Sequence, residues 1–170
     1  MDVVIRPARL EDAEAVVRVH ERASAAMFEE LIGRRFDDVL PFGERLEDCR
    51  RALDEQSGSA QTIVAQRGDE IVGMASWRLA EDGQGELEDL HVVPEAWGTG
   101  VGTRLLDAAV DALSSAGAEA AFLWVGEVNA RARRFYERER WEHDGTRRPS
   151  AFGPIELRYR LIPSRRHASK

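Results

Sequence analysis

Three glycines, Gly98, Gly100 and Gly102, stand at every second position in the stretch HVVPEAWGTGVGTRLL. They lie where an apolar run that ends in Val93 meets a helical pattern of apolar residues. Each glycine costs roughly 0.5–1 kcal/mol relative to alanine inside a regular element. Exposed backbone amides at the beginning of a helix bind anions, because the N–H groups converge and the helix dipole is positive there. The spacing therefore predicts a phosphate site at this strand-to-helix junction.

Three other interpretations of the glycines were weighed. The phosphate loop of nucleotide hydrolases ends in Gly-Lys-Ser or Gly-Lys-Thr, and this stretch has no lysine. The dinucleotide-binding pattern needs a third glycine three residues after the second, where Thr103 or Leu105 stands instead. Glycines that serve turn geometry alone stay open as an alternative for the stretch taken by itself.

Composition bounds the class of protein. The chain has 170 residues, 43% of them hydrophobic and 32% charged, which is typical of one globular domain. Its net charge of -7 argues against a nucleic-acid partner. Cys49 is the single cysteine, so we expect neither a disulfide nor a Cys-His zinc site. No apolar run has the length of a membrane span and the N-terminus lacks a signal-peptide layout, so we expect a cytoplasmic protein without metal or membrane partner.

The hydrophobic periodicity switches between strand and helix along the chain. Strands are expected at 3–8, 61–67, 70–80, 86–94, 120–126, 141–148 and 154–161, and helices at 13–27, 44–56, 102–117 and 129–140. Residues 28–44 are expected to be irregular, because they contain Gly33, Pro41 and Gly43. The order predicts an α+β fold in one domain, 1–162, followed by a polar tail, 163–170.

Two motifs in this framework resemble those of the GNAT family of N-acetyltransferases. LHVVPEAWGTGVGTRLL resembles the family's acetyl-CoA-binding motif, a strand followed by V-x-P-x-x-(R/Q)-x-x-G-x-(G/A). Val92, Pro94, Gly100 and Gly102 match it, and Trp97 stands where Arg or Gln is usual.

The second motif, NARARRFYERERW, looks like the family's N-x-x-A-x-x-x-Y-x-x-x-G-F. Its matches are Asn129, Ala132, Phe135 and Tyr136, while Arg140 and Trp141 replace Gly-Phe. The resemblance runs from Val4 to about Leu161. It implies a central, mostly antiparallel, twisted sheet of six to seven strands, flanked by about four helices and splayed between the fourth and fifth strands.

The resemblance also implies acetyl-CoA as co-substrate. The amides from Gly98 to Thr103 would cradle its pyrophosphate, while Asn129 and Tyr136, on one face of a helix, would follow its pantetheine arm. The implied cofactor contacts are Leu90, Val92, Val93, Trp97, Gly98, Thr99, Gly100, Val101, Gly102, Thr103, Asn129, Ala132 and Tyr136. Arginines 131, 133, 134 and 138 are candidates for the outer phosphate, with a solvated helix face as the alternative.

The reaction that the resemblance implies is direct attack of a primary amine on the thioester in a ternary complex. We expect Tyr136 to protonate the leaving thiolate and a backbone amide, at Leu90 or Val92, to stabilise the oxyanion. A phenol (pKa about 10) is a weaker acid than a thiol (about 8.5), so this proton transfer must accompany bond cleavage. The alternative for Tyr136 is a core aromatic residue beside Phe135.

A base for the amine is expected on the acidic strand GELEDLHVV. Strand alternation places Glu86 and Glu88 on the face of Leu90, and Asp89 and His91 on the opposite face. Glu88 is the predicted base, acting through water, and His91 and Glu86 are its alternatives. The competing interpretation is that these acids form salt bridges with arginines of the sheet.

The predicted acceptor is a small cationic amine or a peptide amine, favoured by the acidic strand. Some peptide N-terminal acetyltransferases of the family have a glutamate where Trp124 stands, which argues against a ribosomal-protein acceptor. Residues 28–45 occupy the position of the family's acceptor site, and His20 is interpreted as a packing residue. A non-catalytic acyl-CoA sensor and an enzyme for longer acyl-CoA are the rival functions. A homodimer is common in the family.

Overall fold

The computed structural model describes residues 2–151 and 153–161. The strands are β1 (Val3–Pro7), β2 (Ala60–Arg67), β3 (Glu70–Leu79), β4 (Gln84–Val92), β5 (Ala120–Gly126), β6 (Trp141–Pro149) and β7 (Ile155–Leu161). The α-helices are α1 (Ala13–Ile32), α2 (Phe36–Val39), α3 (Phe42–Asp54), α4 (Val101–Ser115) and α5 (Ala130–Arg138). Two 3-10 turns, η1 (Leu10–Asp12) and η2 (Pro94–Ala96), precede α1 and the glycine loop.

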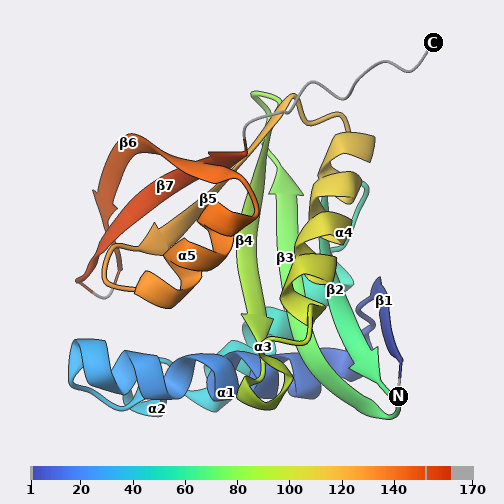
Figure 1. Ribbon diagram of the computed structural model, residues 1–170. Helices are drawn as coiled ribbons and strands as arrows, with labels where there is room; N and C mark the ends of the chain where they lie inside the picture. Colours follow the sequence, from blue (N-terminus) through green and yellow to red (C-terminus); the bar gives the residue numbers. More distant parts are fainter. Residues whose placement is uncertain (1, 152, 162–170) are drawn as a thin grey trace.

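The strands form one sheet in the order β1-β2-β3-β4-β5-β7-β6. Every neighbouring pair is antiparallel except β4 and β5, which are parallel. These two are paired only at their beginnings, where Gln84–Leu87 lies beside Ala120–Leu123. Past that point they diverge (Figure 1). The predicted α+β fold, with a splay between the fourth and fifth strands, is confirmed.

Helices cover both faces of the first half of the sheet. On one face α4 brings Leu105 close to Gly73 of β3 and Leu113 close to Gly85 of β4. Successive residues of a strand point to opposite faces, so Met74 faces the other side, where α1 and α3 pack. In Figure 1 α5 lies apart from α4, in front of β5 and β7. The splay thus lies between two groups of elements, one with α4 and one with α5.

A shared hydrophobic core joins the two groups. Leu105 and Leu106 of α4, Leu123 of β5 and Trp141 of β6 belong to one cluster, and each is at most 2% exposed. Because one cluster contains residues of α4, β5 and β6, continuous hydrophobic packing connects the elements on the two sides of the splay.

The segment between the first two long helices is more regular than the sequence predicted. Residues 28–44 were expected to be irregular, but α1 continues to Ile32 and α2 and the beginning of α3 follow. Phe28 is 7% exposed and extends the buried stripe of α1 by one more turn. The helix ends at Gly33, whose φ of 69° is left-handed and whose N–H donates to the Glu29 carbonyl at 3.0 Å.

Two further expectations concern the ends of the chain and membranes. The predicted domain end at residue 162 and the polar tail 163–170 lie outside the described residues. In the part of the chain that the structure describes, no helix has both the length and the apolar character needed to cross a bilayer.

Candidate active site

The glycine loop leads from the end of β4 into α4. Gly98 and Gly100 have φ values of 75° and 84°, and a Cβ at either position would meet no atom within 4 Å. These two glycines are therefore required by backbone conformation and not by crowding. Gly100 is the N-cap of α4, and no side chain caps its amides. The backbone N–H groups at this helix end are those that an anion would use.

The third glycine lies at a contact between two helices. Gly102 has an ordinary φ, and a Cβ there would lie in van der Waals contact with Phe135, 3.4 Å from its Cε2. The first turn of α4 therefore passes close to α5. Thr103 joins the same two helices, because its Oγ1 donates to Glu139 Oε1 at 3.0 Å.

Trp97 connects the loop to both sides of the splay. Its Nε1 donates to the Val92 carbonyl at 2.7 Å, and the guanidinium carbon of Arg131 lies 3.5 Å from its ring centroid. Where the family usually has Arg or Gln, this chain thus has an indole that stacks with an arginine of α5. The Val92 carbonyl, which was predicted to pair with the cofactor, accepts the hydrogen bond of the Trp97 indole.

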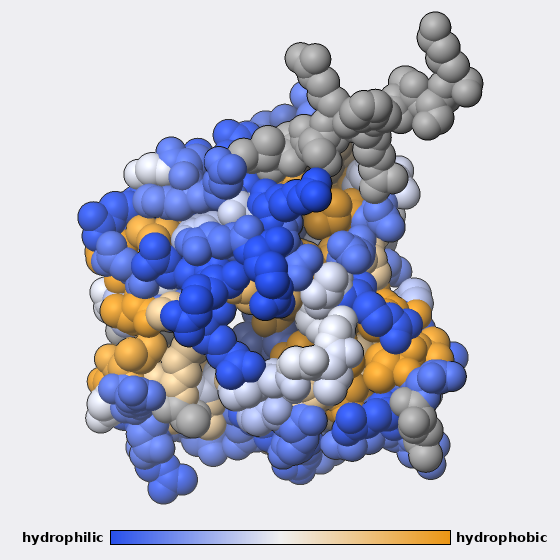
Figure 2. Space-filling model, in the orientation of Figure 1, coloured by the Kyte–Doolittle hydropathy of each residue, from blue (hydrophilic) through white to orange (hydrophobic). Residues whose placement is uncertain are grey.

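The second motif is arranged along α5. Asn129 is the N-cap that precedes the helix, and its Oδ1 accepts a hydrogen bond from Ala132 N at 3.1 Å. Tyr136 is 8% exposed and packs edge-on against the rings of Phe135 and Trp141. Burial, and to a smaller extent the negative charge of Asp89, raises the pKa of Tyr136. In Figure 2 a hollow bordered by hydrophilic residues opens on this face, where Figure 1 has the gap between β4 and α5.

A bulge in β4 changes which acidic residues share a face. Asp89 pairs with Ser76 and Leu87 pairs with Trp77, so Glu88 is an extra residue without a partner on β3. The bulge interrupts the alternation of side chains. The sequence expectation that Glu88 and Asp89 face opposite sides is therefore wrong, because both line one pocket together with His91.

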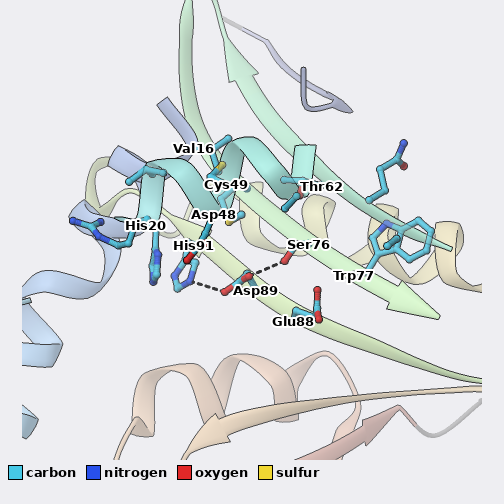
Figure 3. Close-up of a pocket in the computed structure, with 16 residues that line it drawn as sticks. Val16, His20, Asp48, Cys49, Thr62, Ser76, Trp77, Glu88, Asp89 and His91 are labelled. Atoms are coloured by element: carbon cyan, nitrogen blue, oxygen red, sulfur yellow. Dashed lines mark hydrogen bonds and ion pairs between the residues drawn. The ribbon is translucent and has the colours of Figure 1, made fainter. Parts of the chain in front are cut away.

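This pocket, which we call the His91 pocket, is a cavity of about 310 Å³ between α1, α3 and strands β2–β4. Its lining is formed by Val16, Val17, His20, Arg45, Asp48, Cys49, Ala52, Ala60, Gln61, Thr62, Met74, Ser76, Trp77, Glu88, Asp89 and His91. Figure 3 shows these side chains gathered between the sheet and the two helices. Of the segment 28–45, predicted to build the acceptor site, Arg45 is the residue that lines it.

The predicted base, Glu88, lies at an exposed edge of the His91 pocket. Its Oε1 is 2.8 Å from Nε of Arg78, and Glu86 Oε2 is 2.7 Å from Nη2 of the same arginine. Both acids thus form the salt bridges that the competing interpretation expected. Burial nevertheless raises the pKa of Glu88, because its desolvation outweighs the attraction to Arg78.

Asp89 is held more firmly than Glu88. Ser76 Oγ donates to its Oδ2 at 2.7 Å, and His91 Nε2 lies 3.6 Å from its Oδ1 (Figure 3). Burial acts to raise the pKa of Asp89, but His91 and Ser76 together outweigh it and lower the pKa to about 2. The carboxylate is therefore ionised at neutral pH, and 45% of its side-chain surface is still accessible from the pocket.

His20 of α1 lies beside His91. Their ring centroids are 4.4 Å apart, and Phe36 contacts His20 edge-on at 5.2 Å. Burial, with a further contribution from His91, lowers the pKa of His20 to about 4, so its ring is neutral at neutral pH. His20 does pack, as the sequence indicated, but it packs inside the candidate site.

Sequence reasoning missed Ser76, Asp89 and His20 as site residues. A polar His20 on an otherwise apolar stripe was one available signal. Asp89 carried a signal too, because alternation placed it on the face of His91. The strand register adds that the bulge brings Glu88 to the same pocket. In the described part of the chain, no cluster of three or more His, Cys, Asp or Glu residues could hold a metal ion.

The structure thus combines a helix end with uncapped backbone amides, a splay between two parallel strands, and a pocket on β4 that is lined by carboxylates. The family model described as the Acetyltransferase (GNAT) family matches residues 13–140. The chain therefore belongs to the GNAT family.

Individual comparisons agree. An uncharacterized N-acetyltransferase of Mycobacterium bovis is 32% identical over 106 residues, 62% of each chain. The chain covers between 35% and 62% of the length of the curated relatives it matches. The crystal structure of PaiA N-acetyltransferase from Thermoplasma acidophilum, in complex with coenzyme A, has a TM-score of 0.74 at 16% identity, over 93% of this chain and 98% of that one. The ribosomal-protein-S18-alanine N-acetyltransferase from Escherichia coli has a TM-score of 0.69 at 18% identity, over 94% and 93%. At these identities the two structures show the shared fold.

Proposed function

We propose that the chain transfers the acetyl group of acetyl-CoA directly to a primary amine in a ternary complex. The observation that carries this proposal is the position of β4. One end of the strand leads into the glycine loop, and its bulge places Glu88, Asp89 and His91 in a pocket on the face opposite α4. One strand thus connects a site for the acyl donor to a site for the acceptor.

The residues of the splay fit acetyl-CoA. The uncapped amides of α4 and the left-handed Gly98 and Gly100 suit a pyrophosphate. Asn129 and Tyr136 lie on α5 across the splay, where a pantetheine arm would run. Acetyl-CoA would supply an acetyl group activated as a thioester, and the remaining chemistry falls to side chains and amides of this chain.

Three roles are proposed for those groups. The Tyr136 hydroxyl gives a proton to the leaving sulfur, and its raised pKa keeps the phenol protonated until that moment. A backbone N–H of β4, at Leu90 or Val92, stabilises the oxyanion. The proton of the amine goes to a group of the His91 pocket, where both the predicted base Glu88 and its alternative His91 lie.

The pocket favours a small cationic amine as acceptor. Asp48, Glu88 and Asp89 line it, and the guanidinium of Arg45 is already paired with Asp37 at 2.6 Å. A cavity of about 310 Å³ suits a compact molecule or a single terminal residue of a peptide. A peptide amine is the second candidate, supported by the likeness in fold to a protein named for acetylating an alanine.

A thiol-release assay tests the proposal. Acetyl-CoA would be offered with polyamines, amino acids, aminoglycosides and short peptides, using the unsubstituted chain, Tyr136→Phe and Glu88→Gln. Turnover with one amine class, strongly reduced in Tyr136→Phe, supports an acetyltransferase and identifies its acceptor. Tight acetyl-CoA binding without turnover of any amine would instead support the acyl-CoA sensor.

A further inference from the structure

Four polar side chains form a continuous row across the His91 pocket. Ser76 donates to Asp89 at 2.7 Å, Asp89 lies 3.6 Å from His91, and the ring of His91 lies 4.4 Å from that of His20. The four come from β3, β4 and α1, so the sheet and the first helix must both be in place to build the row. Figure 3 shows it crossing the floor of the pocket.

The charge of Asp89 distinguishes it from the other carboxylates of the pocket. Glu88 lies 2.8 Å from Arg78, and Asp48 lies 3.3 Å from Arg51. Asp89 has no lysine or arginine within ion-pair distance among the described residues, and the nearest group that can carry a positive charge is the His91 ring at 3.6 Å. A proton gained by His91 would therefore be stabilised by a carboxylate that no other cation neutralises.

We propose that Asp89 positions His91 as the base that takes the proton of the acceptor amine, and that His20 holds the His91 ring in place by stacking. This inference rests on the proposed acetyl transfer. It extends that proposal by assigning the residue that takes the proton of the amine, which was left open between Glu88 and His91. With Nε2–H directed to Asp89, the other ring nitrogen, Nδ1, carries the lone pair that accepts the proton.

The proton balance closes with the groups present. The acceptor arrives as an ammonium ion and gives one proton to His91, which frees the nitrogen lone pair. A nitrogen–carbon bond forms at the acetyl carbonyl, the carbon–sulfur bond breaks, and the sulfur takes the proton of Tyr136. The attacking nitrogen then loses a second proton, which passes through water to the Tyr136 phenolate. His91 releases its proton to solvent, so one proton is released for each ammonium ion that is acetylated.

The neighbouring charges explain why a single histidine of the pair would gain the proton. His91 faces Asp89 and Glu88 from β4, His20 from α1, and Arg45, Asp48 and Cys49 from α3. His20 is more enclosed and feels the positive charge of Arg45, and its pKa is lowered to about 4. Cys49 is a thiol, since burial raises its pKa to about 11. His20 thus stays neutral and serves as a flat partner for the His91 ring.

Kinetics of four variants test the roles separately, on the amine that the unsubstituted chain acetylates. His91→Gln should lower kcat by roughly 10²–10⁴-fold, and less for amines that are already neutral at the assay pH. Asp89→Asn should lower kcat, by less than His91→Gln does, and leave KM for acetyl-CoA unchanged, because the His91 ring loses its partner while the glycine loop is untouched. His20→Ala should lose roughly 2- to 10-fold in activity, and His20→Phe, which keeps a flat ring beside His91, should lose less than His20→Ala.

The matched control is His143→Gln, which removes an exposed histidine of β6 and should leave the rate and the pH profile unchanged. An unchanged kcat in Asp89→Asn, or a loss that appears in KM for acetyl-CoA instead, would overturn the positioning role. A loss in His91→Gln that is equal for neutral and charged amines would overturn the role of His91 as base. Equal activities in His20→Phe and His20→Ala would overturn the stacking role.

Nuclear magnetic resonance of the histidine rings in the full chain provides a readout that needs no acceptor. Signals are assigned with His20→Phe, His91→Gln and His143→Gln. We expect the His20 ring to be neutral at neutral pH, because its pKa is lowered to about 4. We expect the ring signals of His91 to move in Asp89→Asn, because the ring loses the carboxylate that lies 3.6 Å from its Nε2. If no amine is acetylated, the proposed function fails. If the His91 ring signals are unmoved in Asp89→Asn, the pairing fails even when acetylation is observed.

Discussion

The approach of α4 to β4 at Gly85 yields a prediction whose size follows from the structure. A Cβ on residue 85 would lie 2.7 Å and 3.0 Å from the two terminal carbons of Leu113, and 3.2 Å from Cβ of Ala118. Leu113 is 1% exposed, so its side chain has no free space into which to turn. Gly85→Ala therefore forces an overpacked contact in the paired part of β4, beside Ala121 of β5.

Overpacking of this kind typically costs 1–3 kcal/mol, and for a chain of this length each kcal/mol lowers Tm by roughly 2–4 °C. We expect Gly85→Ala to lower Tm by roughly 2–12 °C in differential scanning calorimetry. The matched control is Gly43→Ala in the first turn of α3, where a Cβ meets no atom within 4 Å. It should be neutral or stabilising, because alanine favours a helix over glycine. Equal Tm values for Gly85→Ala and the unsubstituted chain would refute the packing of α4 on β4.

Three further predictions concern Gly100 in the glycine loop, the proposed acid Tyr136, and Asp12 in η1. Gly100→Ala should lower the free energy of unfolding by about 1–2 kcal/mol, because φ is 84° there. It should also raise KM for acetyl-CoA. Unchanged values of both would contradict the role of the glycine loop in binding acetyl-CoA. Tyr136→Phe should lower kcat by at most roughly 10²–10⁴-fold while calorimetry shows acetyl-CoA binding retained; a lost binding signal would make Tyr136 a structural residue instead. Hydrogen bonds from Arg6, at 2.7 and 3.0 Å, are the largest cause that lowers the pKa of Asp12. Because the folded-state pKa of Asp12 is lowered, its carboxylate stabilises the fold above the unfolded value of about 3.9, and this stabilisation is lost as pH falls through the folded-state pKa. Asp12→Asn should therefore lower the urea midpoint at pH 7, and the difference from the unsubstituted chain should shrink as the pH falls below about 3.9.

Periodicity was sufficient for the fold because its signals are local. The switch from a period of two to a period of 3.6 located every strand, and the two motifs implied the splay that Gln84–Leu87 and Ala120–Leu123 display. The exception was the segment after Phe28, where Gly33, Pro41 and Gly43 suggested irregularity. Two of these residues instead delimit helices, as the C-cap of α1 and the N-cap of α3.

The candidate site was less accessible to sequence reasoning because it depends on contacts between distant residues. The bulge that brings Glu88 and Asp89 to one face follows from the register of β4 on β3. The stacking of His20 on His91 follows from how α1 lies on the sheet. Trp97 and Arg131 meet because α5 comes close to the loop, and the sequence alone left Arg131 open between a phosphate contact and a solvated helix face. Local sequence patterns contain no information on contacts between residues that lie far apart in the chain.

The most direct test of acetyl transfer is mass spectrometry of the amine after incubation with acetyl-CoA and the purified chain. The account predicts a gain of one acetyl group on a primary amine, dependent on acetyl-CoA and strongly reduced in Tyr136→Phe. It also predicts that the protein itself carries no acetyl group, since the transfer is direct. An amine panel that remains unmodified while acetyl-CoA binds tightly, or an acetylated protein side chain on the route to product, would contradict it.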